Sequence, residues 1–236
     1  ATSIAENAGS SLTLTATISQ VADENVIVNL NTAGTSTNGG DYGTLTRITV
    51  SAGDLTGTTS FTPTDDSVYE GNETAVISIS SVSGADAAES GSQSVTITIT
   101  ENDSSPTVTL TTSATSIAEN AGSSLTLTAT SSIAADEDIT VSISTSGTGT
   151  EGNDYSTISD ITISAGSTTG TVSFTPTDDS IYEGNETGIV AISGVSGADA
   201  AESGTQSVTI TISEDDSAPT VTLATSASSI AENAGS

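Results

Sequence analysis

The sequence predicts an all-β protein made of tandem antiparallel β-sandwiches of about seven strands each. Two observations indicate this fold class. Apolar residues alternate with Thr, Ser or Asn in many short runs, which is typical of strands that bury one face. A block of sequence also recurs after 113 residues, a length typical of a whole domain rather than of a solenoid repeat. The 236 residues are therefore sufficient for two domains of ordinary size.

The alternating runs define the expected strands. Gly, Asn and Ser separate the runs, and these residues favour turns. No segment has the apolar periodicity of a helix. Phe61 and Phe174 alternate with Thr and are interpreted as core residues, and Tyr69 and Tyr182 as packing residues at the edge of the core. The runs cover residues 12–16, 26–30, 48–50, 77–79 and 95–99 in the first copy, and 125–127, 139–143, 161–163, 190–192 and 208–212 in the second.

The two copies are nearly identical. The segment Ala1–Ser10 recurs unchanged at 114–123 and, with a single change, at 227–236. About 81 of the 113 aligned positions are identical, which indicates a recent tandem duplication.

The register of the repeat predicts domain boundaries. Pro-Thr-Val-Thr-Leu opens a repeat at 106–110 and again at 219–223, and nothing equivalent precedes Ala1. We therefore expect the strand at 219–225 to complete the first domain of a neighbouring copy by strand addition. The expected domains are a first one that lacks its opening strand at 1–104, a complete one at 105–217, and the opening strand of a third at 218–236.

Composition excludes several classes of function. The chain has no Cys, His or Lys and a formal net charge of -29, with Arg47 as its only cation. Thiol, imidazole and Schiff-base chemistry, disulfides and zinc sites of the Cys/His type have no residues to support them. Nucleic acid and anionic membranes would face like charge, and no apolar run reaches the length of about 20 residues that a spanning helix needs. Disorder is disfavoured because 33% of the residues are hydrophobic and regularly spaced.

The acidic residues recur at the same positions in each copy, at strand ends or in loops, and loops of a sandwich gather at its two ends. Two carboxylates about 5 Å apart repel by roughly 3 kcal/mol at an effective dielectric near 20. Such a cluster needs cations, and many hard oxygen ligands suit Ca²⁺ better than Mg²⁺. The expected ligands are Glu6, Asp41, Asp65, Asp66, Glu70, Glu73, Glu101 and Asp103 (the first tip), Glu119, Asp154, Asp178, Asp179, Glu183, Glu186, Glu214, Asp215 and Asp216 (the second tip), and Glu232 in the third copy.

These acids lie within four ordered motifs: SIAENAG at 3–9, NGGDY at 38–42, DDSVYEGNE at 65–73 and END at 101–103. The combination resembles the Calx-beta domain, which is known from the regulatory loop of sodium–calcium exchangers and from many bacterial and animal extracellular proteins. The resemblance covers nearly the whole chain twice. It implies an immunoglobulin-like sandwich that binds Ca²⁺ at one tip through the acids of these motifs. From the number of ligands we expect about two to four ions per complete tip.

The resulting functional hypothesis is structural. We expect a calcium-binding segment of an extracellular bacterial stalk, adhesin or surface filament, in which Ca²⁺ stiffens domain tips and junctions and copies self-associate into a fibre or array. The alternatives are a Ca²⁺-dependent module that binds a glycan or matrix protein, and a calcium sensor. An enzyme is not expected, because the paired carboxylates crowd loop tips that have no aromatic-lined cleft. The remaining acids are interpreted as solvated hairpin charges, such as Asp23 and Glu24, Asp86 and Glu89, and Asp199 and Glu202.

Overall fold

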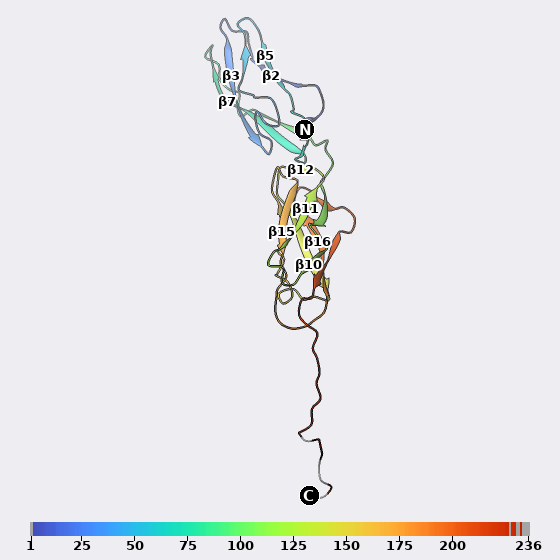
Figure 1. Ribbon diagram of the computed structural model, residues 1–236. Helices are drawn as coiled ribbons and strands as arrows, with labels where there is room; N and C mark the ends of the chain where they lie inside the picture. Colours follow the sequence, from blue (N-terminus) through green and yellow to red (C-terminus); the bar gives the residue numbers. More distant parts are fainter. Residues whose placement is uncertain (1, 227, 230–231, 233–236) are drawn as a thin grey trace.

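The computed structural model describes residues 2–226, 228–229 and 232. It consists of two β-sandwiches that follow one another along a rod, with an extended segment after the second (Figure 1). The described residues contain no helix, and accordingly none that is long and apolar enough to cross a membrane. The predicted all-β tandem architecture is confirmed.

Two sheets form the first sandwich. The larger has the order β1-β8-β7-β3-β4, and the smaller pairs β2 with β5. Neighbouring strands are antiparallel except β1 and β8, which are parallel. The last strand of the domain thus runs beside the first and in the same direction. The strands are β1 (Thr2–Ala5), β2 (Leu12–Thr17), β3 (Val26–Gly34), β4 (Arg47–Val50), β5 (Thr56–Phe61), β7 (Glu73–Ser83) and β8 (Ser94–Thr100).

The second sandwich repeats this arrangement with a fuller second sheet. The sheet β10-β18-β16-β13-β14 corresponds to the larger sheet of the first domain, and β15-β11-β9-β17 faces it. The strands are β9 (Thr107–Thr112), β10 (Ser116–Ala118), β11 (Leu125–Ser131), β13 (Ile139–Gly147), β14 (Ile161–Ile163), β15 (Thr169–Phe174), β16 (Glu186–Ser196), β17 (Ala201–Glu202) and β18 (Ser207–Ser213).

Alternating side chains fill the space between the sheets, as the period of two predicts. Phe61 and Phe174 are fully buried, and each stacks on a buried tyrosine, Tyr42 or Tyr155, with ring centroids 4.7 Å apart. The expected core role of the two phenylalanines is therefore correct.

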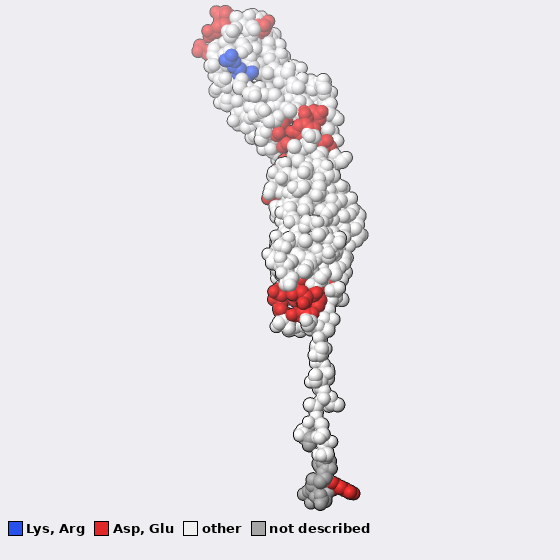
Figure 2. All heavy atoms as spheres, in the orientation of Figure 1, with Lys and Arg blue, Asp and Glu red and all other residues white. Residues whose placement is uncertain are grey.

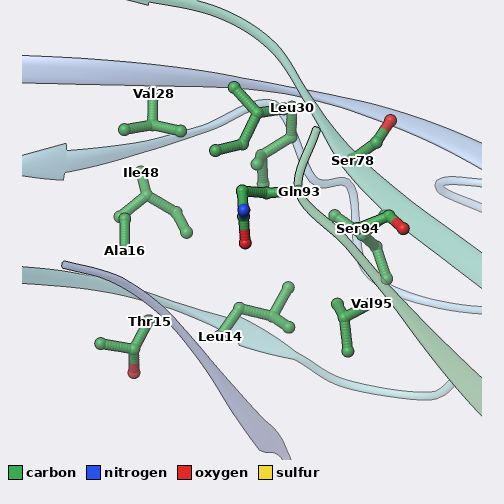
Figure 3. A pocket seen from close by; sticks show the side chains of 12 residues that line it. Leu14, Thr15, Ala16, Val28, Leu30, Ile48, Ser78, Gln93, Ser94 and Val95 are labelled. Carbon is green, nitrogen blue, oxygen red and sulfur yellow. The ribbon is translucent and has the colours of Figure 1, made fainter. Parts of the chain in front are cut away.

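The first sandwich has an open groove where the second has β9. In the second sandwich Val108 and Leu110 of β9 are buried, and β9 pairs with β11 on one side and β17 on the other. No described residue occupies the corresponding place in the first sandwich, which has a groove of about 190 Å³ lined by residues including Leu14, Ala16 and Gln93 (Figure 3). As a result, the buried residues of the first sandwich form two separate clusters and those of the second form one.

A short strand from the first domain joins the second domain. β6 (Val68–Tyr69) pairs in parallel with β12 (Ala134–Ala135), and we call this contact, together with the side-chain contacts of Tyr69, the junction. Tyr69 is 8% exposed and belongs to the core cluster of the second sandwich. The prediction that it packs at the edge of the core of its own domain is therefore wrong. Tyr182, its counterpart, is 46% exposed, because no described segment covers it.

Candidate metal centre

The loops of the first sandwich bring distant carboxylates together beside the junction. Glu6 follows β1, Asp41 lies in the loop between β3 and β4, and Glu70 and Glu73 lie before and at the start of β7. Carboxylate oxygens of Asp41, Glu70 and Glu73 all lie within 4.8 Å of one another. Glu6 and Glu73 are buried, at 5% and 8% exposure, which is exceptional for acidic side chains without a basic partner.

The second tip forms the same arrangement at the far end of the second sandwich. Asp154, Glu183 and Glu186 form one group of carboxylate oxygens within 4.8 Å of one another, and Glu119, Glu214 and Asp215 form another. Figure 2 shows acidic side chains gathered where the two sandwiches meet and again at the far end of the second sandwich.

One acid in each tip organises the loops through the backbone. The Glu101 carboxylate accepts hydrogen bonds from the amides of Glu70 (2.7 Å), Gly71 (2.9 Å), Asn102 and Asp103 (both 2.7 Å). Glu214 accepts the four equivalent bonds in the second tip. Although burial acts to raise it, these donors hold the pKa of Glu101 below its ordinary value.

Other acids of the first tip have fewer donors: Glu6 accepts one backbone hydrogen bond, from the amide of Asp66 at 3.3 Å. Burial, followed by the charges of Asp41 and Glu70, raises the pKa of Glu73 to about 8. Burial also dominates in raising the pKa of Glu6 and of Glu70, each to about 7. Oε2 of Glu73 and Oδ2 of Asp103 are buried without a hydrogen-bond partner. Buried carboxylate oxygens without hydrogen-bond donors are suitable ligands for a hard divalent cation. Ca²⁺ takes six to eight such oxygen ligands.

The remaining predicted ligands are the aspartates of the first tip, those of the second tip, and Glu232. Asp65 and Asp66 are exposed, and after burial and the charge of Glu101 they contribute to raising the pKa of Asp103. Asp178 and Asp179 contribute in the same way to the pKa of Asp216, where burial and the charges of Asp215 and Glu214 act more strongly, and Oδ2 of Asp216 is buried without a hydrogen-bond partner. All eight acids of the first tip and all nine of the second are therefore brought together. Glu232 is exposed on the extended segment, outside both clusters.

The sequence reasoning missed Asp136. This residue belongs to the second domain and follows β12, and its backbone amide donates to the carbonyl oxygen of Tyr69 at 3.2 Å. Burial and the charge of Glu137 raise the pKa of Asp136, and Asp41 and Glu101 of the first tip add to this, so its carboxylate lies near the first tip across the junction. No local motif marks Asp136, because its proximity depends on the packing of the two domains.

The interpretation of the hairpin acids as merely solvated is wrong in part. Glu24 Oε1 accepts from the amide of Ala85 at 2.5 Å, and Glu89 Oε1 accepts from the amide of Gln93 at 2.6 Å. Asp199 Oδ2 accepts the hydroxyl hydrogen bond of Tyr69 at 3.0 Å. Glu24 and Glu89 thus accept from turn amides, whereas Asp199 accepts from a side-chain hydroxyl of the first domain.

Fold and site together define a class of protein: tandem β-sandwiches with carboxylate-rich loop tips suited to divalent cations. The family model of the Calx-beta domain matches residues 1–103 and 101–216, and the chain belongs to this family. Calx-beta domains bind Ca²⁺ in homologues and are not catalytic domains. No curated protein matches the sequence.

Several solved structures are similar to the chain at low sequence identity. CBD12 from CALX1.2 is 14% identical over 90% of this chain and 96% of its own, with a TM-score of 0.37. The Apo-form Calx CBD1 domain is 16% identical over 47% of this chain and 99% of its own, with a TM-score of 0.40. Invasin, a bacterial integrin-binding protein, is 17% identical over 91% of this chain and 38% of its own, with a TM-score of 0.42.

Proposed function

We propose that the chain is a calcium-binding structural segment of an extracellular bacterial stalk, adhesin shaft or surface filament. The observation that carries the proposal is the position of the first tip: Glu70 directly follows the junction strand β6, and the amide of Asp136 in the next domain donates to Tyr69 beside it. A cation held there neutralises charges from both domains and so opposes their separation. The two sandwiches are nearly identical in sequence and follow one another along a rod (Figure 1). This arrangement supports a role as a spacer more than a role as two distinct recognition modules.

The ligands of each tip follow from the carboxylates that are close together. In the first tip Asp41, Glu70 and Glu73 hold one ion, and Glu6, Glu101 and the acids at 65, 66 and 103 hold others. This number of oxygens suits about two to four Ca²⁺ per tip. Outside cells Ca²⁺ is abundant, so weak sites with dissociation constants of about 10⁻⁴–10⁻³ M remain filled.

A Ca²⁺ titration followed by small-angle scattering and calorimetry tests this function. We expect the melting temperature to rise sharply with Ca²⁺, the rod to become stiffer, and the midpoint to lie above the micromolar range. A melting curve that is insensitive to Ca²⁺ and to chelator would refute the metal assignment. A micromolar midpoint with a large change of shape would favour the calcium sensor, and chelator-sensitive binding on a glycan array would favour the recognition module.

Self-association by strand addition is the second part of the proposal. Residues 219–223 repeat the sequence of 106–110, of which residues 107–110 form the first part of β9, the strand that occupies the position of the groove in the second sandwich. In the extended segment Val221 is 95% exposed and Leu223 is 100% exposed. The vacant groove and the extended segment lie toward opposite ends of the rod, so pairing between copies is favoured over pairing within one (Figure 1).

The register of this addition follows from the second sandwich. Leu110 pairs with Ala129 and donates its amide hydrogen bond to Gln206 Oε1 at 3.4 Å. The equivalent pairing places Leu223 opposite Ala16 of a second copy, within reach of Gln93. Sedimentation of the chain and of a variant without residues 217–236 tests the addition. Concentration-dependent growth of the intact chain alone supports it, and equal behaviour of the two refutes it.

A further inference from the structure

The junction between the two sandwiches consists of a small set of specific contacts. Val68 and Tyr69 pair with Ala134 and Ala135, and the Tyr69 side chain enters the core of the second sandwich. Its hydroxyl donates to Asp199 Oδ2 at 3.0 Å. The contact therefore combines main-chain pairing, a buried aromatic ring and a satisfied hydroxyl, the features typical of an interface anchor.

The same anchor occurs, uncovered, at the far end of the second sandwich. The counterparts of Val68 and Tyr69 are Ile181 and Tyr182, which are 60% and 46% exposed. They lie in a loop with the same internal support, because the Asp179 carboxylate accepts from the amide of Ile181 at 2.6 Å as Asp66 does from that of Val68 at 2.7 Å. Exposed large apolar side chains next to each other in a supported loop are a candidate interaction surface.

The acceptor for such an anchor is present, uncovered, on the first sandwich. Val21 and Ala22 correspond to the β12 residues Ala134 and Ala135; Val21 is 54% exposed, whereas Ala135 is buried by the junction. Asp86 corresponds to Asp199, and it keeps the same left-handed backbone, with φ of 49° against 48°. This conformation is uncommon outside glycine. The first sandwich therefore maintains the turn that receives a tyrosine hydroxyl.

We propose that Ile181 and Tyr182 of one copy dock onto Val21, Ala22 and Asp86 of the first sandwich of a second copy, reproducing the junction between chains. This inference rests on the proposed self-association and adds a second contact to the strand addition. The strand addition and the tyrosine docking can occur together. Each residue of the proposed contacts is offset by 113 positions from its counterpart in the second sandwich or the junction, so both contacts reproduce one existing arrangement. Ile181 then pairs with Val21, and Tyr182 with Ala22, in parallel register.

Contact at two points would make the pairing between two copies specific. The strand contact alone is a generic addition to a sheet edge, whereas the tyrosine contact requires a matching acceptor beside the same groove. Once the strand is seated, docking of Tyr182 becomes effectively intramolecular, and its gain adds to that of the strand. The interface also places Asp23, the counterpart of Asp136, against the second tip of the preceding copy.

Site-directed disulfide formation tests the proposed register. The chain contains no Cys, so one copy carrying Ile181→Cys and another carrying Val21→Cys form an unambiguous pair. Adjacent strands lie about 4.8 Å apart, within the range of Cα separations that a disulfide spans. Arg47→Cys replaces Val21→Cys in the control, because Arg47 is exposed on β4 and its counterpart, Asp160, accepts hydrogen bonds from Ser142 and Ile143 within its own domain and not across the junction.

We expect a cross-linked dimer from the Ile181→Cys and Val21→Cys mixture in Ca²⁺ under mild oxidation, and little above background with the control. Tyr182→Ser is expected to weaken sedimenting assembly by about tenfold or more, as loss of an aromatic anchor does. Assembly that depends on residues 217–236 but gives no cross-link above the control overturns the docking while leaving strand addition intact. A chain that stays monomeric at about 100 μM overturns both.

Discussion

Replacing Glu73 by Gln tests the electrostatic balance of the first tip directly. The Glu73 side chain is 8% exposed, and its Oε2 is buried without a hydrogen-bond partner. Oxygens of Asp41, Glu70 and Glu73 lie within 4.8 Å of one another. Glu73→Gln keeps the shape of the side chain and removes one charge. It should therefore stabilise the protein in chelator and destabilise it in Ca²⁺.

The magnitude follows from the separations. At 4.8 Å and an effective dielectric near 20, each pair of carboxylates repels by about 3.5 kcal/mol, and Glu73 takes part in two such pairs. Salt and solvent at the loop surface reduce this, and we expect a net gain of about 2 kcal/mol in chelator. Because the pKa of Glu73 is raised to about 8, the gain appears at pH 9 and is small at pH 6. For a sandwich of this size, about 2 kcal/mol shifts the melting temperature by roughly 8 °C.

Calorimetry of the wild type and Glu73→Gln at pH 9, with chelator and with millimolar Ca²⁺, measures both signs. In Ca²⁺ the lost ligand is expected to lower affinity about tenfold, which costs about 1.4 kcal/mol. Glu186→Gln is the matched change in the second tip, and Asp160→Asn removes a charge outside both tips. A lower melting temperature for Glu73→Gln in chelator, or a higher one in Ca²⁺, would contradict the reasoning.

Three further predictions concern the tip and the junction. In chelator, the acids of the first tip with pKa raised to about 7 or 8 bind more protons when folded than unfolded, so stability should fall as the pH rises from 5 to 9, measured by melting temperature. Tyr69→Phe should cost about 1 kcal/mol in urea unfolding, because the hydrogen bond to Asp199 is lost, whereas Tyr182→Phe in the monomer should change nothing measurable. Asp136→Asn should leave each tip's own ligands in place yet reduce the stiffening by Ca²⁺ seen in small-angle scattering; an unchanged response would show that Asp136 does not face the ions.

The sequence predicted those features that depend on local periodicity. Alternating residues located β2, β3, β4, β7 and β8 because each strand has one buried face, and the repeat then located their counterparts. The run at 56–61 that forms β5 was visible only through Phe61, since Thr and Gly fill most of the strand. The parallel pairing of β1 with β8 has no local signature, because it depends on how the chain crosses the domain.

The acids of the two tips were also predictable, because they recur at equivalent loop positions. Their separate roles were not. Glu101 and Glu70 are both acids in ligand loops, yet four backbone amides surround the first carboxylate, whereas burial and repulsion act on the second. Asp136 and the burial of Tyr69 arise from contact between domains. Because Tyr69 and Tyr182 lie in nearly identical segments, the sequence does not indicate which of the two is covered.

Several of the proposed metal ligands and the junction anchor belong to the same loop, which would link ion binding to the proposed assembly. Asp66 accepts from the amide of Val68, and Glu101 accepts from that of Glu70, so two tip carboxylates hold the residues on either side of Tyr69. A cation that fixes these carboxylates also fixes the segment that presents the ring. Thermodynamic linkage makes the effect reciprocal, so docking of the ring strengthens cation binding by the same factor. The second tip repeats this support around Tyr182. On the proposed self-association, cation binding at the tips would therefore favour joining of copies, and assembly should weaken in chelator.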